Sequence, residues 1–351
     1  MSDEVLDHLW TTYVHRFLAE GGAYGDFLDA RKRFASFSQW CAGWSEIAQG
    51  TEARADEALA RGFIRTAASE LSRAAFYYGF AQLPFWHDPP AKRTAYEHAA
   101  RVWRRAAPLL DPPLQPVAIP YRAINMPGYL RLPSAAKKPA CVVLLGGLDS
   151  TKEEMQVISD LCIARGLATL SFDGPGQGET FFKMKLAPDF VEAVLAVFDF
   201  AEKLPSIDGS RLGIIGRSLG GYYAPRAAAL DRRVKAAAVW GAMYHLRNYR
   251  SLPPLTAAGF IFATGAKDLD DARSYLESID LDDVAGQIAC PLLIVHSGRD
   301  VITPTDNATL MHERVKGSEL LFFRDSGHCV HDRAHICRPA MADFMCMHLA
   351  D

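Results

Sequence analysis

The sequence predicts an α/β protein in which a mostly parallel sheet is covered by helices on both faces and preceded by a helical N-terminal domain. The first part of the chain is rich in residues that favour helices, above all in residues 52–82. The later part alternates short apolar segments with helical patterns, which is typical of a parallel sheet with crossover helices. Because the proline-rich segment 111–120 interrupts the helical pattern, we expect two domains, residues 1–113 and residues 114–351.

The N-terminal domain contains two clear helical patterns. Residues 52–82 suit one long helix or two, with Gly62 and Gly79 as the weak points, and residues 91–110 suit another. Near the junction of the two patterns lies a group of aromatic residues: Phe76, Tyr77, Tyr78, Phe80, Phe85 and Trp86. We interpret this group as a core that packs the helices together. The alternative is that some of the rings line a substrate cavity.

The second domain is predicted from its succession of apolar segments. The expected strands are residues 123–132, 141–145, 168–172, 212–215, 236–239, 292–295 and 320–323. The expected helices between them are residues 153–165, 189–203 and 219–230. In such a sheet, ligands bind at the carboxyl ends of the strands, so functional residues are expected directly after the strands.

Composition excludes several classes of function. The formal net charge is −3, from 41 acidic and 38 basic residues, which argues against a nucleic-acid partner. The acidic start lacks the pattern of a signal peptide, and the longest stretch without charged residues or histidine, residues 251–266, is too short for a membrane span. The 7 cysteines include no C-x-x-C pair, which argues against a disulfide framework or a structural zinc site. We therefore expect a cytoplasmic protein with reduced cysteines and no membrane partner.

The strongest chemical signal is the pattern G-x-S-x-G at residues 216–220, centred on Ser218. A predicted strand precedes it and a predicted helix follows it. In this context a tight, strained turn exposes the serine at the edge of the sheet, and only small residues fit on either side of it. The alternative interpretation is a glycine-rich turn with an incidental serine. The context favours Ser218 as a nucleophile.

A serine hydroxyl needs a base to remove its proton, so a histidine is expected late in the chain. His328 comes directly after the last predicted strand, where this fold places its base. His331 is the rival because it lies only three residues further on. His296 lies within an apolar strand, and we interpret it as a core residue.

An acidic residue must orient the imidazole and stabilise its cationic form. Asp300 follows a predicted strand and is the candidate, with a turn-forming aspartate as the alternative. Asp325 is close to His328 in sequence, but we assign it to the loop itself. The chain order Ser218, Asp300, His328 is that of the α/β-hydrolase fold.

Two backbone N–H groups are expected to hold the negative oxygen of a tetrahedral intermediate. One is that of Leu219, directly after the nucleophile. The other is that of Leu148, in the glycine-containing loop after the predicted strand 141–145. A plain strand-to-helix turn is the alternative interpretation of this loop.

Two further acidic positions follow strands. Asp149 is expected either to reach the substrate or to help begin a helix, since Ser150 and Glu153 fit a capping box. Asp173 opens the turn Asp-Gly-Pro-Gly-Gln-Gly at residues 173–178, which lacks the Gly-Lys-Ser/Thr ending of a phosphate loop. We interpret this turn as structural.

Taken with their flanking residues, the segments 144–154, 172–179, 216–221 and 325–328 resemble a family of α/β-hydrolases that includes 2,6-dihydroxypseudooxynicotine hydrolase, which cleaves a C–C bond beside a ketone. Fungal polyketide-shortening hydrolases are similar. The resemblance covers nearly the whole chain and implies a helical N-terminal domain that caps the active site and contributes to a homodimer. It supports Ser218, Asp300 and His328 as the triad. It also points to Asp149, where the nicotine-pathway enzyme has a glutamate, one methylene longer.

The leading functional hypothesis is a serine hydrolase that cleaves a C–C bond beside a carbonyl in an aromatic ketone, a β-diketone or a polyketide-like compound. A carboxylesterase, a thioesterase or an acyltransferase uses the same residues and is the nearest alternative. A non-catalytic binding protein of the same fold is the alternative from another class. Neither a metal nor an organic cofactor is required, and the expected partner is a small-molecule substrate. Tyr244 and His245, after the predicted strand 236–239, are candidate substrate contacts, with ordinary packing as the alternative.

Overall fold

The computed structural model describes residues 3–134 and 137–350. They divide into two compact units between Gln115 and Pro116. The division falls close to the boundary expected at residue 113. The N-terminal unit is helical: α1 Asp3–Ala19, α2 Tyr24–Arg33, η1 Phe37–Gln39, α3 Trp40–Ala60, α4 Ile64–Gln82, α5 Pro89–Ala106 and η2 Ala107–Leu109, where η denotes a short 3-10 helix.

The helical unit has an aromatic core. Residues 52–82 belong to two helices, α3 and α4, which part at Gly62, whose φ of 74° is left-handed, whereas Gly79 continues the helix. Tyr77 and Phe80 of α4 are fully buried and pack against Trp44 of α3, with ring centroids 5.6 Å and 5.2 Å apart. For these rings the structure confirms the packing core.

The described residues form one sheet, in the order β1-β2-β4-β3-β5-β6-β7-β8, which belongs to the second unit except for the first two residues of β1. The strands are β1 Leu114–Tyr121, β2 Ile124–Arg131, β3 Cys141–Leu145, β4 Ala168–Phe172, β5 Leu212–Arg217, β6 Val234–Trp240, β7 Leu292–Ser297 and β8 Glu319–Phe323. β2 pairs antiparallel with β4, and the pairs from β4 through β3, β5, β6 and β7 to β8 are parallel. Every predicted strand is present, so the expected α/β class is confirmed.

β1 was not predicted, because its residues Pro116 and Pro120 indicate a break between domains. In the structure β1 is the edge strand of the sheet. Proline lacks the N–H group that a central strand must donate, but an edge strand tolerates this loss.

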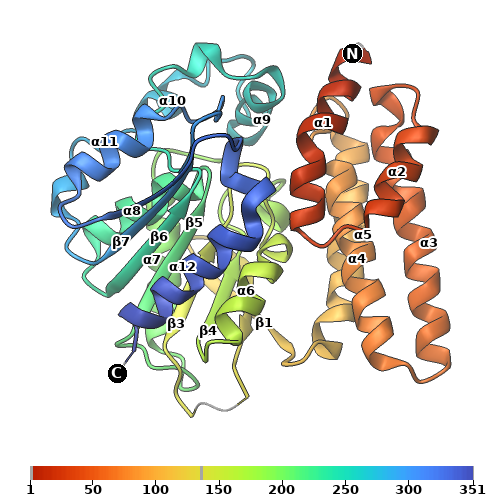
Figure 1. Ribbon diagram of the computed structural model, residues 1–351, viewed down its shortest axis with the longest axis horizontal. Coiled ribbons are helices and arrows are strands. Elements are labelled where there is room, and N and C mark those ends of the chain that lie inside the picture. The colour runs from red at the N-terminus through yellow and green to blue at the C-terminus, as the bar shows by residue number, and fades with distance from the viewer. Residues whose placement is uncertain (1–2, 135–136, 351) are drawn as a thin grey trace. The chain divides into compact units, whose positions relative to one another are not determined.

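Helices cover both faces of the sheet (Figure 1). α6 and α12 lie on one face, where they enclose a core that includes Ile158, Met341 and Met345, and α7 and α8 pack together on the other. The helices and short 3-10 helices of this unit are η3 Lys152–Met155, α6 Gln156–Ile163, η4 Gly178–Thr180, α7 Phe190–Glu202, α8 Gly220–Leu230, η5 Tyr249–Ser251, α9 Pro254–Thr264, α10 Arg273–Ser278, η6 Ala285–Gln287, α11 Asp306–Arg314, η7 His328–Arg333 and α12 Ala334–His348. None of the helices among residues 3–134 and 137–350 combines the length and apolar character that a membrane span requires.

The parallel strands bring six loops to one edge of the sheet. β3, β4, β5, β6, β7 and β8 run in the same direction, so the segments that follow them all start at the same edge. Each segment that carries a candidate chemical group in the sequence follows one of these strands. This edge therefore gathers the candidate site.

Candidate active site

Ser218 lies in a strained turn between β5 and α8. Its φ is 55°, in the left-handed region that a residue other than glycine rarely adopts. Its N–H donates to the Trp240 carbonyl of the neighbouring strand at 2.9 Å, which holds the turn in place. A Cβ on Gly216 would lie 2.1 Å from the Gly220 carbonyl oxygen, so no side chain fits there. The strand–turn–helix context expected for this serine is present.

His328 is hydrogen-bonded to both other residues of the predicted triad. Its Nε2 lies 2.8 Å from the Ser218 Oγ, and its Nδ1 lies 2.7 Å from the Asp300 Oδ2. An ionised carboxylate only accepts hydrogen bonds, so Nδ1–H donates to Asp300 and Nε2 is left to accept the Ser218 proton. The His328 side chain is 20% exposed, which leaves the imidazole accessible to a substrate.

The carboxylate of Asp300 is fully buried and well supplied with donors. Its Oδ1 accepts from the Ile302 and Thr303 N–H groups at 2.9 and 2.8 Å, and its Oδ2 accepts from the Thr303 hydroxyl at 2.8 Å. Burial alone would raise the pKa of Asp300, but the adjacent His328 and these donors outweigh it and lower the pKa to about 2. Burial would also lower the pKa of His328, but the Asp300 carboxylate outweighs burial and raises it well above its usual value. The buried anion therefore makes His328 a stronger base.

The rival residues lie elsewhere. His331 faces Arg338, whose Nη2 is 3.5 Å from its Nδ1, and Asp325 is exposed and pairs with Arg299 at 2.8 Å. His296 is buried in β7, donates from Nε2 to the Thr303 carbonyl at 2.9 Å, and has its pKa lowered by burial, as expected for a core residue. Among the described residues, His328 alone is hydrogen-bonded to the Ser218 hydroxyl.

The two N–H groups predicted to hold an oxyanion belong to buried residues. Within residues 3–134 and 137–350, neither the Leu148 nor the Leu219 N–H donates a hydrogen bond to a protein acceptor. Buried N–H groups without an acceptor are rare because leaving a donor unpaired costs free energy. The loop between β3 and η3, residues 146–151, is called the Leu148 loop below. It approaches the nucleophile closely, since a Cβ on Gly147 would lie 3.0 Å from the Ser218 Cβ. Among the described residues, both N–H groups therefore lie beside the serine turn and can still donate a hydrogen bond to a substrate oxygen.

Asp149 is half-buried in the same loop, after Leu148. The capping box proposed as its alternative role is wrong, because η3 begins after Thr151 and has no side-chain cap. Ser150 instead places its Oγ 2.6 Å from the Arg217 Nη2, which also bonds to Glu154. Arg217 precedes the nucleophile and is buried, so this contact joins the Leu148 loop to the serine turn.

Three carboxylates behind this loop, those of Glu153, Asp173 and Glu179, lie close enough together to be candidate ligands of a metal ion. The Lys152 ammonium occupies their midst, with Nζ 2.7 Å from the Glu153 Oε1, 2.7 Å from the Asp173 Oδ2 and 2.9 Å from the Glu179 Oε1. The pKa of Glu153 is raised, and burial of its carboxyl group is the main cause. A lysine already supplies the positive charge, so these residues fit a structural ion cluster better than a metal centre.

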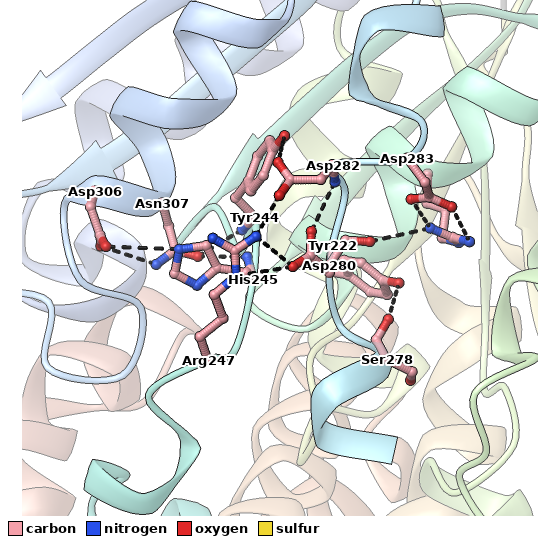
Figure 2. A network of polar contacts seen from close by, with 11 residues as sticks. Tyr222, Tyr244, His245, Arg247, Ser278, Asp280, Asp282, Asp283, Asp306 and Asn307 are labelled. Carbon is pink, nitrogen blue, oxygen red and sulfur yellow. Dashed lines mark hydrogen bonds and ion pairs between the residues drawn. The ribbon is translucent and has the colours of Figure 1, made fainter. Parts of the chain in front are cut away.

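Tyr244 and His245 belong to a polar network after β6, drawn in Figure 2. Their N–H groups donate to the Asn307 Oδ1 at 2.8 and 2.9 Å, and the Tyr244 hydroxyl bonds to Asp282 at 2.9 Å. His245 Nε2 lies 3.8 Å from the Asp306 carboxylate. Within the described chain neither residue is hydrogen-bonded to Ser218 or His328, so their contact with a substrate stays a prediction.

Two residues of the site were not predicted. Thr303 supports the Asp300 carboxylate, and its place three residues after an aspartate in a turn is the signal that identifies it. Gln177 bonds to the carbonyls of Gly146 and Gly147 in the Leu148 loop. The turn 173–178 that holds Gln177 had been assigned no more than a structural role.

Comparisons with known proteins agree on a hydrolase. The family model described as Esterase FrsA-like matches residues 26–253, and that of the Prolyl oligopeptidase family matches residues 162–350. The 2,6-dihydropseudooxynicotine hydrolase of Paenarthrobacter nicotinovorans is 33% identical over 333 residues, which are 94% of this chain and 90% of that protein. A solved structure of 2,6-dihydroxy-pseudo-oxynicotine hydrolase superposes with a TM-score of 0.89 at 33% identity, covering 96% of this chain and 95% of that one.

Fungal relatives match over a shorter region. Hydrolase acrC of Aspergillus aculeatus is 34% identical in an alignment of 232 residues that covers 59% of this chain and 54% of that protein. The aligned region thus spans about half the length of such fungal relatives. A solved structure of AbyA5 has a TM-score of 0.77 at 18% identity over 97% of this chain and 93% of that one, which shows a shared fold alone.

Proposed function

Because this chain belongs to the FrsA-like esterase family of α/β-fold hydrolases, we propose that it is a serine hydrolase that cleaves a C–C bond beside a carbonyl. The single observation that carries the proposal is the pair of hydrogen bonds that His328 forms, with the Ser218 Oγ at 2.8 Å and with the Asp300 Oδ2 at 2.7 Å. The strained backbone at Ser218 supports it, since strain of this kind is typical of functional sites.

In the proposed first step, the Ser218 oxygen adds to the substrate carbonyl while His328 Nε2 takes the hydroxyl proton. The carbonyl oxygen becomes negative and accepts hydrogen bonds from the Leu148 and Leu219 N–H groups. Each such donor typically contributes about 10²- to 10³-fold to the rate. The unused capacity of these two N–H groups is the observation that supports this role.

Collapse of the tetrahedral intermediate then breaks the C–C bond. The electron pair leaves with the carbon fragment, which takes up one proton, and the acyl group stays on Ser218. His328 gives up the proton that it took from Ser218, either directly to carbon or through Asp149 of the loop after β3 as a relay, and so becomes a base again. Water, deprotonated by His328, finally releases the acyl group as a carboxylic acid. The net reaction consumes one water and needs no oxidant or cofactor.

The substrate class is proposed as an aromatic ketone, β-diketone or polyketide-like compound. It rests on the 33% identity with a pseudooxynicotine hydrolase over 94% of this chain and on the C–C chemistry that the sequence resemblance implies. An electron-poor or hydroxylated ring stabilises the departing carbanion and makes this cleavage feasible. The further proposals of a small-molecule substrate and a homodimer rest on the same resemblance, and light scattering on the purified protein tests the dimer. A cytoplasmic location is proposed from the composition and the acidic start of the sequence.

Ester cleavage by the same residues is the second candidate, favoured by the match of residues 26–253 to a model described as an esterase. The chemistry separates the two, because an oxygen leaving group is far less basic than a carbanion and receives its proton from His328, so it depends less on a second proton carrier. Asp149→Asn is therefore expected to slow β-diketone cleavage much more than ester cleavage. An equal effect on both substrates would favour the esterase.

The test is a panel of aryl esters, thioesters and β-diketones, assayed with the wild type and with Ser218→Ala. The variant is expected to lose at least about 10⁴-fold in kcat on every productive substrate, because the nucleophile is absent. A fluorophosphonate probe should add covalently to the wild type and not to the variant, as read by intact-protein mass spectrometry. Equal turnover by both proteins would refute the serine mechanism.

A further inference from the structure

The turn after β4 presents one buried carboxamide to the Leu148 loop. The Gln177 Nε2 donates to the Gly147 carbonyl at 2.8 Å and to the Gly146 carbonyl at 3.2 Å. Its Oε1 accepts from the Gly174 N–H at 3.1 Å. Only this orientation of the amide group pairs its nitrogen with acceptors and its oxygen with a donor. Gln177 is almost fully buried, so water does not compete for these bonds.

The bond to the Gly147 carbonyl has a geometric consequence for Leu148. In a trans peptide the C=O and N–H groups of one unit lie in one plane and point in opposite directions. The carbonyl of Gly147 and the N–H of Leu148 belong to the same unit. Holding that carbonyl on Gln177 therefore aims the Leu148 N–H away from Gln177. Among the described residues, no protein acceptor receives this N–H.

The same peptide unit runs past the nucleophile. A Cβ on Gly147 would lie 3.0 Å from the Ser218 Cβ and 3.3 Å from the Arg217 carbonyl oxygen. Gly147 therefore fits between the serine turn and Gln177 because it has no side chain. The Gly147 carbonyl also accepts from the Ser150 N–H, but at 3.4 Å, so Gln177 at 2.8 Å supplies its shorter bond. Without that bond, the peptide unit next to glycine is held less firmly and the direction of the Leu148 N–H becomes less well defined.

The turn that carries Gln177 also bonds to Lys152, the residue directly after the Leu148 loop. The buried Asp173 carboxylate accepts from the Lys152 N–H at 2.8 Å, from the Lys152 ammonium at 2.7 Å and from the Glu179 N–H at 3.1 Å. Lys152 opens η3, directly after the loop, and Glu179 follows Gln177. The turn thus holds the loop at two points, one through Gln177 and one through Asp173.

From this geometry we propose that Gln177 is a positioning residue, which aims the Leu148 N–H at the oxyanion of the tetrahedral intermediate. The inference rests on the proposed serine mechanism and extends it to the turn 173–178. Gln177 touches neither the nucleophile nor the base by a hydrogen bond, and it acts through the peptide unit between Gly147 and Leu148. Its contribution therefore arises mainly in the transition state, where the oxygen carries its charge.

The test compares Gln177→Leu with the matched surface control Gln287→Leu, whose glutamine is exposed. In Gln177→Leu, kcat for an aryl ester is expected to fall about 10- to 100-fold, up to the loss of one oxyanion donor, with KM within about threefold. A trifluoromethyl ketone forms a tetrahedral adduct on a serine, so its inhibition constant should rise by the same factor. The control should match the wild type in all three quantities.

Two results would overturn the proposal. One is a folded Gln177→Leu protein whose kcat stays within about twofold of the wild type, well below the expected loss. The other is a loss of kcat with no change in the inhibition constant of the trifluoromethyl ketone. Ser218→Ala separates this failure from that of the proposed function. If Ser218→Ala is inactive while Gln177→Leu behaves as the wild type, only the positioning role is wrong.

Gln177→Glu decides the matter if the leucine variant does not fold. This change preserves size and the acceptor for the Gly174 N–H, but the new group donates to a carbonyl only when it is protonated. Burial and the two carbonyl oxygens raise the pKa of such a carboxyl group. Its kcat should therefore decline with rising pH across a range where that of the wild type does not. A profile that matches the wild type in both height and shape would overturn the proposal.

Discussion

Replacing Asp300 by asparagine tests the electrostatic core of the proposed mechanism. The Nδ1 of His328 and the Oδ2 of Asp300 are 2.7 Å apart, and the carboxylate is fully buried. Opposite unit charges about 4 Å apart attract each other by about 4 kcal/mol at an effective dielectric constant of about 20. Loss of this stabilisation of the imidazolium corresponds to about 10³-fold in kcat. The asparagine amide also favours the wrong tautomer of His328, which brings the expected loss to about 10⁴-fold.

The assay is kcat and KM for an aryl ester, with the melting temperature measured in parallel. The matched control is Asp325→Asn, because Asp325 lies in the loop of His328 but its side chain is exposed and forms an ion pair with the exposed Arg299. This control should stay within about twofold of the wild type, as expected for a surface ion pair. The reasoning fails if a folded Asp300→Asn protein keeps more than about a tenth of its kcat, or if the control loses as much.

Three further predictions follow from the same contacts. The kcat/KM of the wild type should fall as pH drops through the pKa of His328, with a midpoint above the ordinary value of about 6.5, because Asp300 raises that pKa. In Thr303→Val the Asp300 carboxylate loses a donor, so the free energy of unfolding at pH 7 should drop by about 1.5–3 kcal/mol relative to Thr303→Ser. The pKa of Asp300 is lowered to about 2 in the folded protein, so its carboxylate stabilises the fold at pH values above its usual pKa. The difference in unfolding free energy between Thr303→Val and Thr303→Ser should therefore shrink in urea titrations as pH falls toward about 2. Lys152→Met should destabilise the protein by about 3–5 kcal/mol in urea unfolding at pH 7, because it leaves buried carboxylates uncompensated. Arg250→Met, which breaks an exposed ion pair, should cost less than about 1 kcal/mol.

The sheet was predictable because its central strands are buried on both faces and are therefore continuous apolar segments in the sequence. β3, β4 and β5 are fully buried along their length, and all three were predicted. β1 was not, because its prolines indicate a break unless one knows that the strand lies at the edge of the sheet. The place of a strand in the sheet depends on which distant segments pair with it, so no local sequence pattern predicts it.

The site shows the same limit at the level of side chains. Ser218, Asp300 and His328 were predicted because each follows a strand, and parallel strands bring such positions to one edge. Gln177 also follows a strand, but its role depends on which carbonyl oxygens lie opposite it. Ser150 was assigned to a capping box from its spacing to Glu153, whereas the structure pairs it with Arg217, which lies 67 positions away. Contacts between distant segments decide such roles, and local spacing does not predict them.

Backbone strain in this chain gathers around the nucleophile and the base. Among the described residues, the non-glycine residues with positive φ are Arg122, Ser218, Cys329 and Val330. Three of these four residues are Ser218 itself or follow His328 directly, and a β-branched residue such as Val330 is especially unfavourable there. Each such residue costs about 1–3 kcal/mol, and the conformation persists only if the surroundings determine it. Cys329 and Val330 are buried in the core beneath the sheet edge, so packing can hold them in this turn. The turn lies between His328 and α12, so it redirects the chain toward that helix directly after the base, whose Nε2 lies 2.8 Å from the Ser218 Oγ.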